Sequence, residues 1–237
     1  MIKVKGIHKQ FGHVKVLDGV SFDIKKQGVV AVLGPNGSGK TTILKTILGM
    51  VLPQKGEIYY DNQPVIGKYD YRKEISYLPQ IAQFPENLIV SELIDMIKNI
   101  RNMPSNEEEI IELFGVGSFL DKKLSNLSGG TKQKVNIVLT FMFDSPLYIL
   151  DEPTAGLDPL SLIHLKELIQ QEKSKGKTIL ITTHIMSLVE DLSDEIIFLL
   201  EGKIYFQGSV QELEKETGQN DLEHAIAKIL EKDVQNT

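Results

Sequence analysis

The sequence contains no cysteine, and this absence excludes several kinds of chemistry. Without cysteine there is no disulfide framework, no thiolate metal site and no thiol nucleophile, which fits a reducing compartment. With 41% hydrophobic and 24% charged residues, the composition is ordinary for a globular protein and excludes the disordered and fibrous classes. A chain of 237 residues can bury a sizeable core, as one large domain or two small ones.

Long apolar segments and an excess of positive charge are also missing. The N-terminus lacks the run of about 7–15 apolar residues that a secretory signal needs. The longest apolar runs, such as Val29–Leu33, are far shorter than the roughly 20 residues that span a bilayer. The 26 basic and 32 acidic residues give a net charge of −6, which argues against broad affinity for nucleic acid or anionic lipid. We expect a cytoplasmic protein that reaches a membrane only by docking onto a partner.

Strand patterns that alternate with helical patterns predict an α/β fold with a mixed, mainly parallel sheet and right-handed crossovers. The first thirty residues alternate apolar and polar positions, which predicts an N-terminal antiparallel β subdomain. Further strands are expected at Val29–Leu33, Gly56–Tyr60, Ile75–Leu78, Leu147–Leu150, Thr178–Thr182 and Glu195–Leu199. Helices are expected at Thr41–Leu48, Ser91–Ile100, Asn106–Phe114, Leu160–Gln171 and Ile185–Asp191.

The whole chain is interpreted as one domain made of three parts. Residues 1–80 and 145–209 form the core, and residues 81–144 form an inserted helical subdomain without strands. Residues 210–237 form a helical tail whose apolar stripe follows a cap at Asn220 or Asp221. We favour packing of this stripe against its own domain over docking to a partner. The stripe consists of Leu222, Ile226, Ile229 and Leu230.

A glycine-rich segment lies between the strand Val29–Leu33 and a predicted helix, and it fits the pattern G-x4-G-K-[ST]. Its glycines allow the backbone to wrap around a phosphate with N–H groups pointing inward. The helix N-terminus adds a partial positive charge and Lys40 adds a full one. The Thr41 hydroxyl would then reach a Mg²⁺ on the outer phosphates. The residues expected to hold the phosphates are Gly34, Pro35, Asn36, Gly37, Ser38, Gly39, Lys40, Thr41 and Thr42.

Two carboxylates follow the apolar strand that begins at Leu147. At the C-terminal edge of a parallel sheet, Asp151 can hold Mg²⁺ directly or through water. Its neighbour Glu152 can turn toward a γ-phosphate and orient or deprotonate a water molecule. An acidic pair alone is more often a solvated loop, but its combination with a phosphate loop favours a catalytic site.

A second glycine pair precedes another predicted helix, which begins near Thr131. Ser128, Gly129 and Gly130 offer a hydroxyl and free amides at this N-terminus, which makes a second candidate anion site. Two anion sites in one chain need either two ligands or one ligand that both sites contact. The apolar side of this helix is expected to consist of Val135, Val138, Leu139 and Met142.

Taken together, these motifs resemble the nucleotide-binding subunits of ATP-binding-cassette (ABC) transporters over nearly the whole chain. The resemblance implies the P-loop NTPase fold of ABC ATPases, and the motifs follow one another in the order found in that family. GPNGSGKT at 34–41 resembles the Walker A loop, and YILDE at 148–152 the Walker B strand. LSGG at 127–130 resembles the signature motif, and AGLD at 155–158 the D-loop. Gln80 resembles the Q-loop glutamine and His184 the switch histidine.

The resemblance implies a mechanism in which two subunits face head to tail and bind ATP and Mg²⁺ between them. Ser128 and the amides of Gly129 and Gly130 would bind the γ-phosphate held by the other subunit. The groups implied in catalysis are Glu152, His184 and Gln80, and those implied in metal binding are Thr41, Gln80 and Asp151. Asp158 would couple the two sites, and Phe11 would stack on adenine, a contact worth about 1–3 kcal/mol. The chain departs from the family with Thr131 in place of glutamine and Phe11 in place of tyrosine.

The resemblance also implies partners: a homodimer or a pairing with a related ATPase, and a polytopic membrane permease that docks near Gln80–Leu93. In that segment Phe84, Pro85 and Leu88 form an apolar cluster. The protein would be peripheral on the cytoplasmic face of the membrane, with no nucleic-acid partner. A soluble ABC ATPase that acts on ribosomes or DNA is the alternative, and a kinase or GTPase with a phosphate loop does not explain LSGG.

The cargo is less defined by the sequence. The short tail resembles exporter-type cassettes, and residues 77–94 and 222–230 resemble the copper-processing ATPase of nitrous oxide reductase maturation. There is no clustered soft-ligand spacing for copper, so any metal would pass through other subunits.

Overall fold

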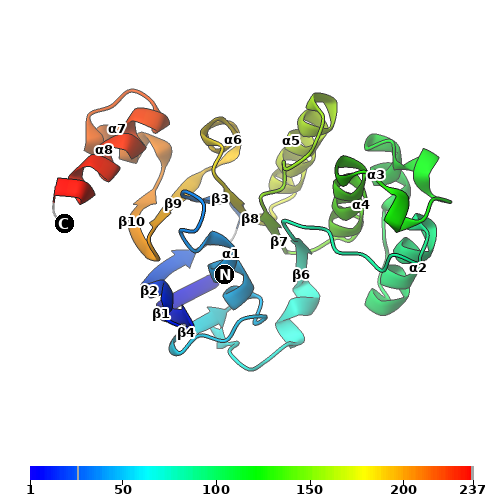
Figure 1. The fold of residues 1–237 in the computed structure, drawn as a ribbon, viewed down its shortest axis with the longest axis horizontal. Coiled ribbons are helices and arrows are strands. Elements are labelled where there is room, and N and C mark those ends of the chain that lie inside the picture. Colours follow the sequence, from blue (N-terminus) through cyan, green and yellow to red (C-terminus); the bar gives the residue numbers. More distant parts are fainter. Residues whose placement is uncertain (26, 236–237) are drawn as a thin grey trace. The chain divides into compact units, whose positions relative to one another are not determined.

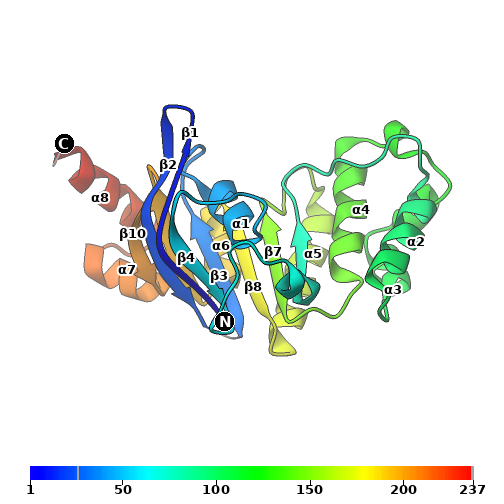
Figure 2. The same cartoon turned by 90° about the horizontal axis from the view of Figure 1, so that it is seen from below.

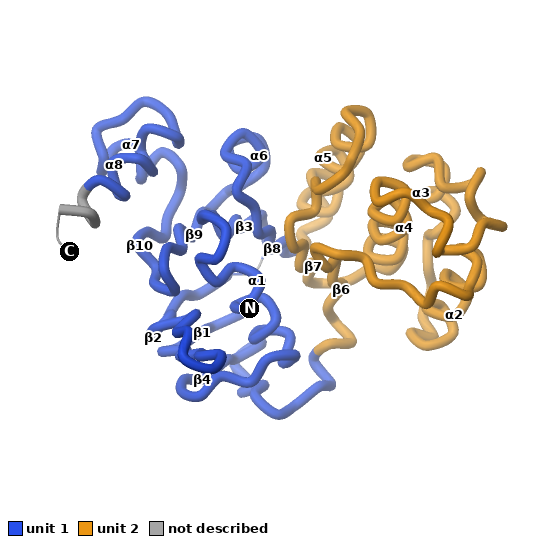
Figure 3. The backbone as a smooth tube through the Cα atoms, viewed as in Figure 1, with its two compact units in different colours: residues 1–71, 178–237 blue, residues 72–177 orange. Residues whose placement is uncertain are grey.

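The computed structural model describes residues 1–25 and 27–235, and the chain divides into two compact units (Figures 1 and 3). Unit 1 comprises residues 1–71 and 178–237, and unit 2 comprises residues 72–177. The predicted helical insert, residues 81–144, lies within unit 2. That these residues form a subdomain of their own stays a prediction. Across the described residues no helix combines the length and apolar character needed to span a lipid bilayer.

An antiparallel sheet in unit 1 has the order β2-β1-β4-β5. Figure 2 shows β1 and β2 as a long hairpin, which confirms the predicted antiparallel sheet. The strand predicted at Gly56–Tyr60 also belongs to this sheet, because it pairs with β1. Only glycine fits at position 56, since a Cβ there would lie 2.4 Å from the Gly6 carbonyl oxygen. The strands are β1 (Ile2–Phe11), β2 (Val14–Ile24), β4 (Lys55–Tyr60) and β5 (Gln63–Pro64).

A second sheet in unit 1 is mostly parallel and carries α1 (Lys40–Ile47) and α6 (Met186–Leu192) in its connections. β3 pairs in parallel with β8 on one side and with β9 on the other, and β10 joins β9 in an antiparallel hairpin. β10 has no counterpart in the sequence-based prediction, because its half-exposed residues lack a clear period. The strands are β3 (Gly28–Leu33), β8 (Thr178–Thr183), β9 (Glu195–Leu200) and β10 (Lys203–Gly208).

The tail forms two helices, α7 (Val210–Thr217) and α8 (Leu222–Gln235), rather than one continuous helix. Gly218 adopts a left-handed conformation and ends α7, and the Asp221 carboxylate accepts the His224 N–H at the start of α8. Figure 1 shows both helices beside β9 and β10. The stripe packs within unit 1, as predicted, and residues 236–237 lie outside the described residues. The buried cluster includes Ala31, Leu33, Ile196, Phe198, Leu213, Leu222, Ala225 and Ile226.

Unit 2 is built around a parallel strand pair and four helices. β6 and β7 pair from Ile75 opposite Leu147 to Leu78 opposite Leu150, as the apolar runs predict. Phe141 stacks on Tyr148 with ring centroids 5.0 Å apart, which joins α4 to the strand pair. The elements are β6 (Ile75–Leu78), α2 (Val90–Arg101), α3 (Glu107–Leu113), α4 (Gly129–Phe141), β7 (Leu147–Asp151) and α5 (Pro159–Ser174). Short 3₁₀ turns are η1 (Asp70–Glu74, spanning the boundary of the units), η2 (Val116–Phe119) and η3 (Leu124–Asn126).

We predict that Leu222→Ala lowers the free energy of unfolding by about 2–5 kcal/mol, because it leaves a cavity in the buried cluster of unit 1. Urea unfolding followed by circular dichroism measures this loss. Lys228→Ala on the same helix is the control, because its side chain is 46% exposed and should change stability by less than about 0.5 kcal/mol. Equal stability of Leu222→Ala and the parent would contradict packing of α8 against its own unit.

Candidate functional site

The loop between β3 and α1 has a backbone that only glycine can supply. Gly37 and Gly39 have φ angles of 82° and 108°, in the region that L side chains rarely adopt. At Gly34 a Cβ would lie 2.1 Å from the Leu199 carbonyl oxygen, so the start of the loop packs directly on the end of β9. Gly39 is the cap residue of α1 and has no side chain to cover the N-terminal amides of the helix. The loop therefore presents a helix N-terminus to a ligand.

Lys40 and Ser38 place a charge and a hydroxyl inside this loop. The Lys40 side chain is buried, and its Nζ donates to the carbonyl oxygens of Gly34 at 2.8 Å and Pro35 at 3.2 Å. Ser38 is 3% exposed, and within the described residues its Oγ has no hydrogen-bond partner. A buried hydroxyl without a partner is costly, so this atom fits a site built to receive an acceptor such as a phosphate oxygen.

His184 lies at the same edge of the sheet as the loop. Leu33 is opposite Thr183 in the parallel pairing of β3 with β8, so Gly34 and His184 leave neighbouring strands in register. His184 is exposed, and the turn that holds it is fixed by the Ile185 N–H, which donates to Thr183 Oγ1 at 3.0 Å. The structure thus brings together two of the motifs predicted for unit 1.

Phe11 ends β1 and is 49% exposed, beside the turn at Gly12. The Lys9 Nζ lies 4.8 Å from the centroid of its ring. A large exposed ring is costly in water, and a cation near it raises the local positive potential. Phe11 is therefore available to stack on a planar, electron-rich group, and its contact with adenine stays a prediction.

Unit 2 brings Gln80, Asp151 and Glu152 to the edge of its strand pair. Leu78 lies opposite Leu150, so the chain leaves β6 toward Gln80 where β7 ends at Asp151. Asp151 is fully buried and Gln80 is exposed. Glu152 is 5% exposed and has a φ of 48°, a left-handed conformation that non-glycine residues adopt at a cost. Such strain in a buried acidic residue is typical of functional sites.

Tyr77 is a feature of this edge that the sequence did not single out. Its hydroxyl is buried without a hydrogen-bond partner among the described residues. Burial, together with the charge of Asp151, raises the pKa of Tyr77 to about 12. Tyr77 therefore stays a neutral phenol beside the Asp151 carboxylate at physiological pH. An aromatic residue directly before the last residue of a strand gives no signal that would separate it from a core residue.

The Ser128 hydroxyl caps α4 and accepts the Thr131 N–H at 3.2 Å. Its Oγ also lies 2.9 Å from the Thr131 hydroxyl, so the threonine that departs from the family pattern has a partner within the motif. Gly130 packs against the D-loop segment, because a Cβ on it would lie 2.7 Å from the Gly156 carbonyl oxygen. Ser128 and Gly129 are exposed, so this helix N-terminus faces outward for a ligand.

Asp158 is held within unit 2 by three contacts. It caps α5 by accepting the Ser161 N–H and hydroxyl, each at 2.9 Å, and Lys134 Nζ lies 2.7 Å from its Oδ2. The Lys134 ammonium and these hydrogen bonds hold the pKa of Asp158 well below its ordinary value. Lys134 is not among the predicted site residues, although it lies on α4 only six residues after Ser128.

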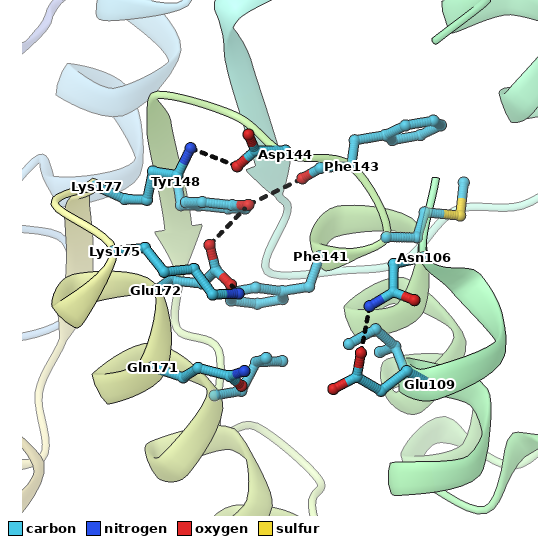
Figure 4. A pocket seen from close by; sticks show the side chains of 13 residues that line it. Asn106, Glu109, Phe141, Phe143, Asp144, Tyr148, Gln171, Glu172, Lys175 and Lys177 are labelled. Carbon is cyan, nitrogen blue, oxygen red and sulfur yellow. Dashed lines mark hydrogen bonds and ion pairs between the residues drawn. The ribbon is translucent and has the colours of Figure 1, made fainter. Parts of the chain in front are cut away.

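A pocket of about 450 Å³ in unit 2 includes none of the predicted site residues in its lining (Figure 4). Both lysines of the lining are paired with carboxylates: Lys175 contacts Glu172 at 2.7 Å, and Lys177 contacts Asp144. The Tyr148 hydroxyl donates to the Phe143 carbonyl at 2.8 Å and also contacts Glu172, and burial raises its pKa. Because both lysines are already paired with carboxylates, the pocket has little to attract a phosphate, and the predicted site residues lie elsewhere.

Comparison with known proteins agrees with this geometry. A sequence profile of the family described as ABC transporter matches residues 17–155. The lantibiotic transport ATP-binding protein SrtF of Streptococcus pyogenes is 35% identical over 211 residues, which cover 87% of this chain and 90% of that protein.

Two solved structures resemble the chain closely. One, an ATP-binding subunit of an ABC transporter, has a TM-score of 0.89 at 29% identity and covers 97% of this chain and 99% of its own. The other, the cassette MJ0796, is a dimer in a post-hydrolysis state bound to ADP and Pi. It has a TM-score of 0.79 at 26% identity and covers 88% of this chain and 98% of its own.

We predict that Lys134→Met raises the pKa of Asp158 toward its ordinary value of 3.8, measured by NMR titration. Because the folded pKa of Asp158 is depressed, the ion pair stabilises the protein above pH 3.8 and this contribution disappears as the pH falls through the folded pKa. The parent should therefore be more stable than Lys134→Met at pH 7, and the difference should shrink on acidification. A difference that grows in acid would contradict this assignment. Lys132→Met is the matched control, because Lys132 lies on the same helix and, within the described part of the chain, makes no ion pair with Asp158.

Proposed function

Since this chain belongs to the ABC transporter family of ATP-binding proteins, we propose that it energises transport through a separate membrane permease, onto which it docks from the cytoplasmic side. The chain is an ATPase of this family. The observation that carries the proposal is the loop from Gly34 to Lys40, with its left-handed glycines, its buried Lys40 and a buried Ser38 hydroxyl that has no hydrogen-bond partner among the described residues. These are the features that a polyphosphate chain needs.

Residues of the predicted motifs would bind the nucleotide and its Mg²⁺. The ring of Phe11 stacks on adenine, while the loop amides and the Lys40 ammonium take the phosphates. Thr41 and Asp151 supply the oxygen ligands that Mg²⁺ prefers, with Gln80 close to Asp151 in the register of β6 and β7; when bound, Mg²⁺ neutralises phosphate charge. His184 leaves β8 beside the loop and would contact the γ-phosphate.

Hydrolysis breaks the bond between the γ-phosphorus and the oxygen that bridges it to the β-phosphate. A water oxygen forms the new bond to phosphorus, ADP departs with the bridging oxygen, and Glu152 accepts or orients the water proton. Ser128, Gly129 and Gly130 would bind the γ-phosphate of a second copy or a related ATPase, because their helix N-terminus is exposed and capped within its own chain. The dimeric cassette MJ0796 supports such pairing.

The permease would bind the segment from Gln80 to Leu93. Ile81 is 68% exposed and Phe84 is half-buried, so apolar surface is available next to Gln80. A partner that binds there would move the main chain next to Gln80, the residue proposed to contact Mg²⁺ and the attacking water. Export is the proposed direction, and the permease sets the cargo.

We predict that Glu152→Gln retains ATP binding, slows hydrolysis by about two or more orders of magnitude and traps an ATP-dependent dimer, because it removes the carboxylate but keeps the side-chain shape. Phosphate release and size-exclusion chromatography with ATP measure the two effects. Glu109→Gln, an exposed carboxylate on α3, is the control. Hydrolysis at the parental rate would remove Glu152 from the mechanism.

We also predict that the full chain co-purifies with a polytopic membrane protein from detergent extracts. Ile81→Asp should reduce this recovery, because it places a charge in the proposed apolar contact, while the ATPase rate of the isolated chain should change little. Mass spectrometry of the purified complex identifies the partner. Recovery mainly with ribosomes or DNA would support the soluble alternative instead.

A further inference from the structure

Three polar side chains of α4 are buried, although the sequence pattern predicts an apolar face for this helix. Gln133 and Asn136 are each 4% exposed, and Thr140 is 3% exposed. They follow one another at helical spacings of three and four residues, so they lie along one side of α4. Buried amides are costly unless they are hydrogen-bonded, so their partners show what this side of the helix does.

The two amides donate to backbone carbonyls at the ends of β6 and β7. Asn136 Nδ2 donates to the Pro79 carbonyl at 3.0 Å, and Gln133 Nε2 donates to the Pro153 carbonyl at 2.9 Å. Asn136 Nδ2 also lies 3.5 Å from Gln133 Oε1, which joins the two side chains. A continuous polar connection therefore runs from Pro79 through α4 to Pro153.

Both carbonyls are adjacent to residues assigned to hydrolysis. Pro79 directly precedes Gln80, and Pro153 directly follows Glu152. The pairing of β6 with β7 ends at Leu78 opposite Leu150, so the strand ladder does not hold either segment. Proline has no N–H and cannot extend a ladder. The side-chain amides of α4 thus supply the hydrogen bonds where the strands stop.

We propose that Asn136 is a positioning residue for ATP hydrolysis, which together with Gln133 holds the main chain beside Gln80 and Glu152 to the helix that begins at Ser128. This inference rests on the proposed roles of Gln80 and Glu152. Thr140 extends the same side of the helix, because its hydroxyl donates to the Asn136 carbonyl at 2.8 Å. A displacement of the signature helix is thereby transmitted to both segments through hydrogen bonds rather than through apolar packing alone.

The test compares Asn136→Leu, Gln133→Leu and the double variant in the full chain. Each leucine keeps a similar volume and removes the amide donor. We expect each single variant to lower kcat by about ten-fold or more, because small displacements of positioned groups are costly, while affinity for a non-hydrolysed ATP analogue stays within about two-fold. The double variant should lose little more than the worse single variant, because both residues belong to one connection.

Ser145→Ala is the matched control, because Ser145 is 1% exposed and its Oγ lies 2.8 Å from Ser76 Oγ, in the same unit and away from Gln80 and Glu152. It should lower the thermal midpoint and leave kcat at the parental value. Parental kcat in Asn136→Leu, or single effects that multiply in the double variant, would overturn the proposal. A loss of kcat that only follows the thermal midpoint, as judged against Ser145→Ala, would also overturn it.

Glu152→Gln distinguishes failure of the proposed site from failure of the positioning role. If Glu152→Gln hydrolyses ATP normally, the proposed site is wrong. If Glu152→Gln is inactive and Asn136→Leu is fully active, only the positioning role is rejected.

Discussion

Parallel strand pairing in register is the constraint on which the rest of the structure depends. In unit 1 the pairing of Leu33 with Thr183 places the phosphate loop and His184 at one sheet edge. In unit 2 the pairing of Leu78 with Leu150 does the same for the segments of Gln80 and Glu152. Because all side chains of a strand change faces when the register shifts by one residue, the buried strands fix these positions firmly. The polar residues then need only short loops to reach a ligand.

Burial of polar groups distinguishes these edges from the apolar cores behind them. Asp151, Glu152, Ser38 and Lys40 are all nearly or fully buried. Each is costly to keep away from water, and the fold accepts that cost where a charged ligand would compensate it. In the pocket around Glu172, by comparison, the carboxylates of Glu172 and Asp144 are paired with Lys175 and Lys177. The burial of polar groups at the predicted motifs, rather than pocket size, therefore supports the proposed ligand-binding edges.

Much of the fold and the site could be predicted from the sequence because the signals were local. The apolar run at Ile75–Leu78, the loop pattern at Gly34 and the cap at Ser128 depend on neighbouring residues only. The unpredicted features depend on contacts between distant segments. Asn136 and Pro79, or Lys134 and Asp158, meet only after folding, and β10 forms only because β9 offers it an edge. The start of α8 was also a local signal, since the cap predicted at Asn220 or Asp221 is present at Asp221, whereas the end of α7 at Gly218 was not singled out.

The left-handed backbone at Glu152 limits which substitutions can test the catalytic role of its carboxylate. Residues branched at Cβ are strongly disfavoured in this conformation, whereas glutamine has the same unbranched stem as glutamate. Valine or threonine at this position would distort the turn as well as remove the charge, so inactivity in such a protein would have two causes. Exchange to glutamine removes the charge and replaces one acceptor oxygen by an N–H donor, but it keeps the length and branching of the side chain. The backbone conformation at this one position thus determines whether a mutation there removes only the catalytic group or also distorts the local fold.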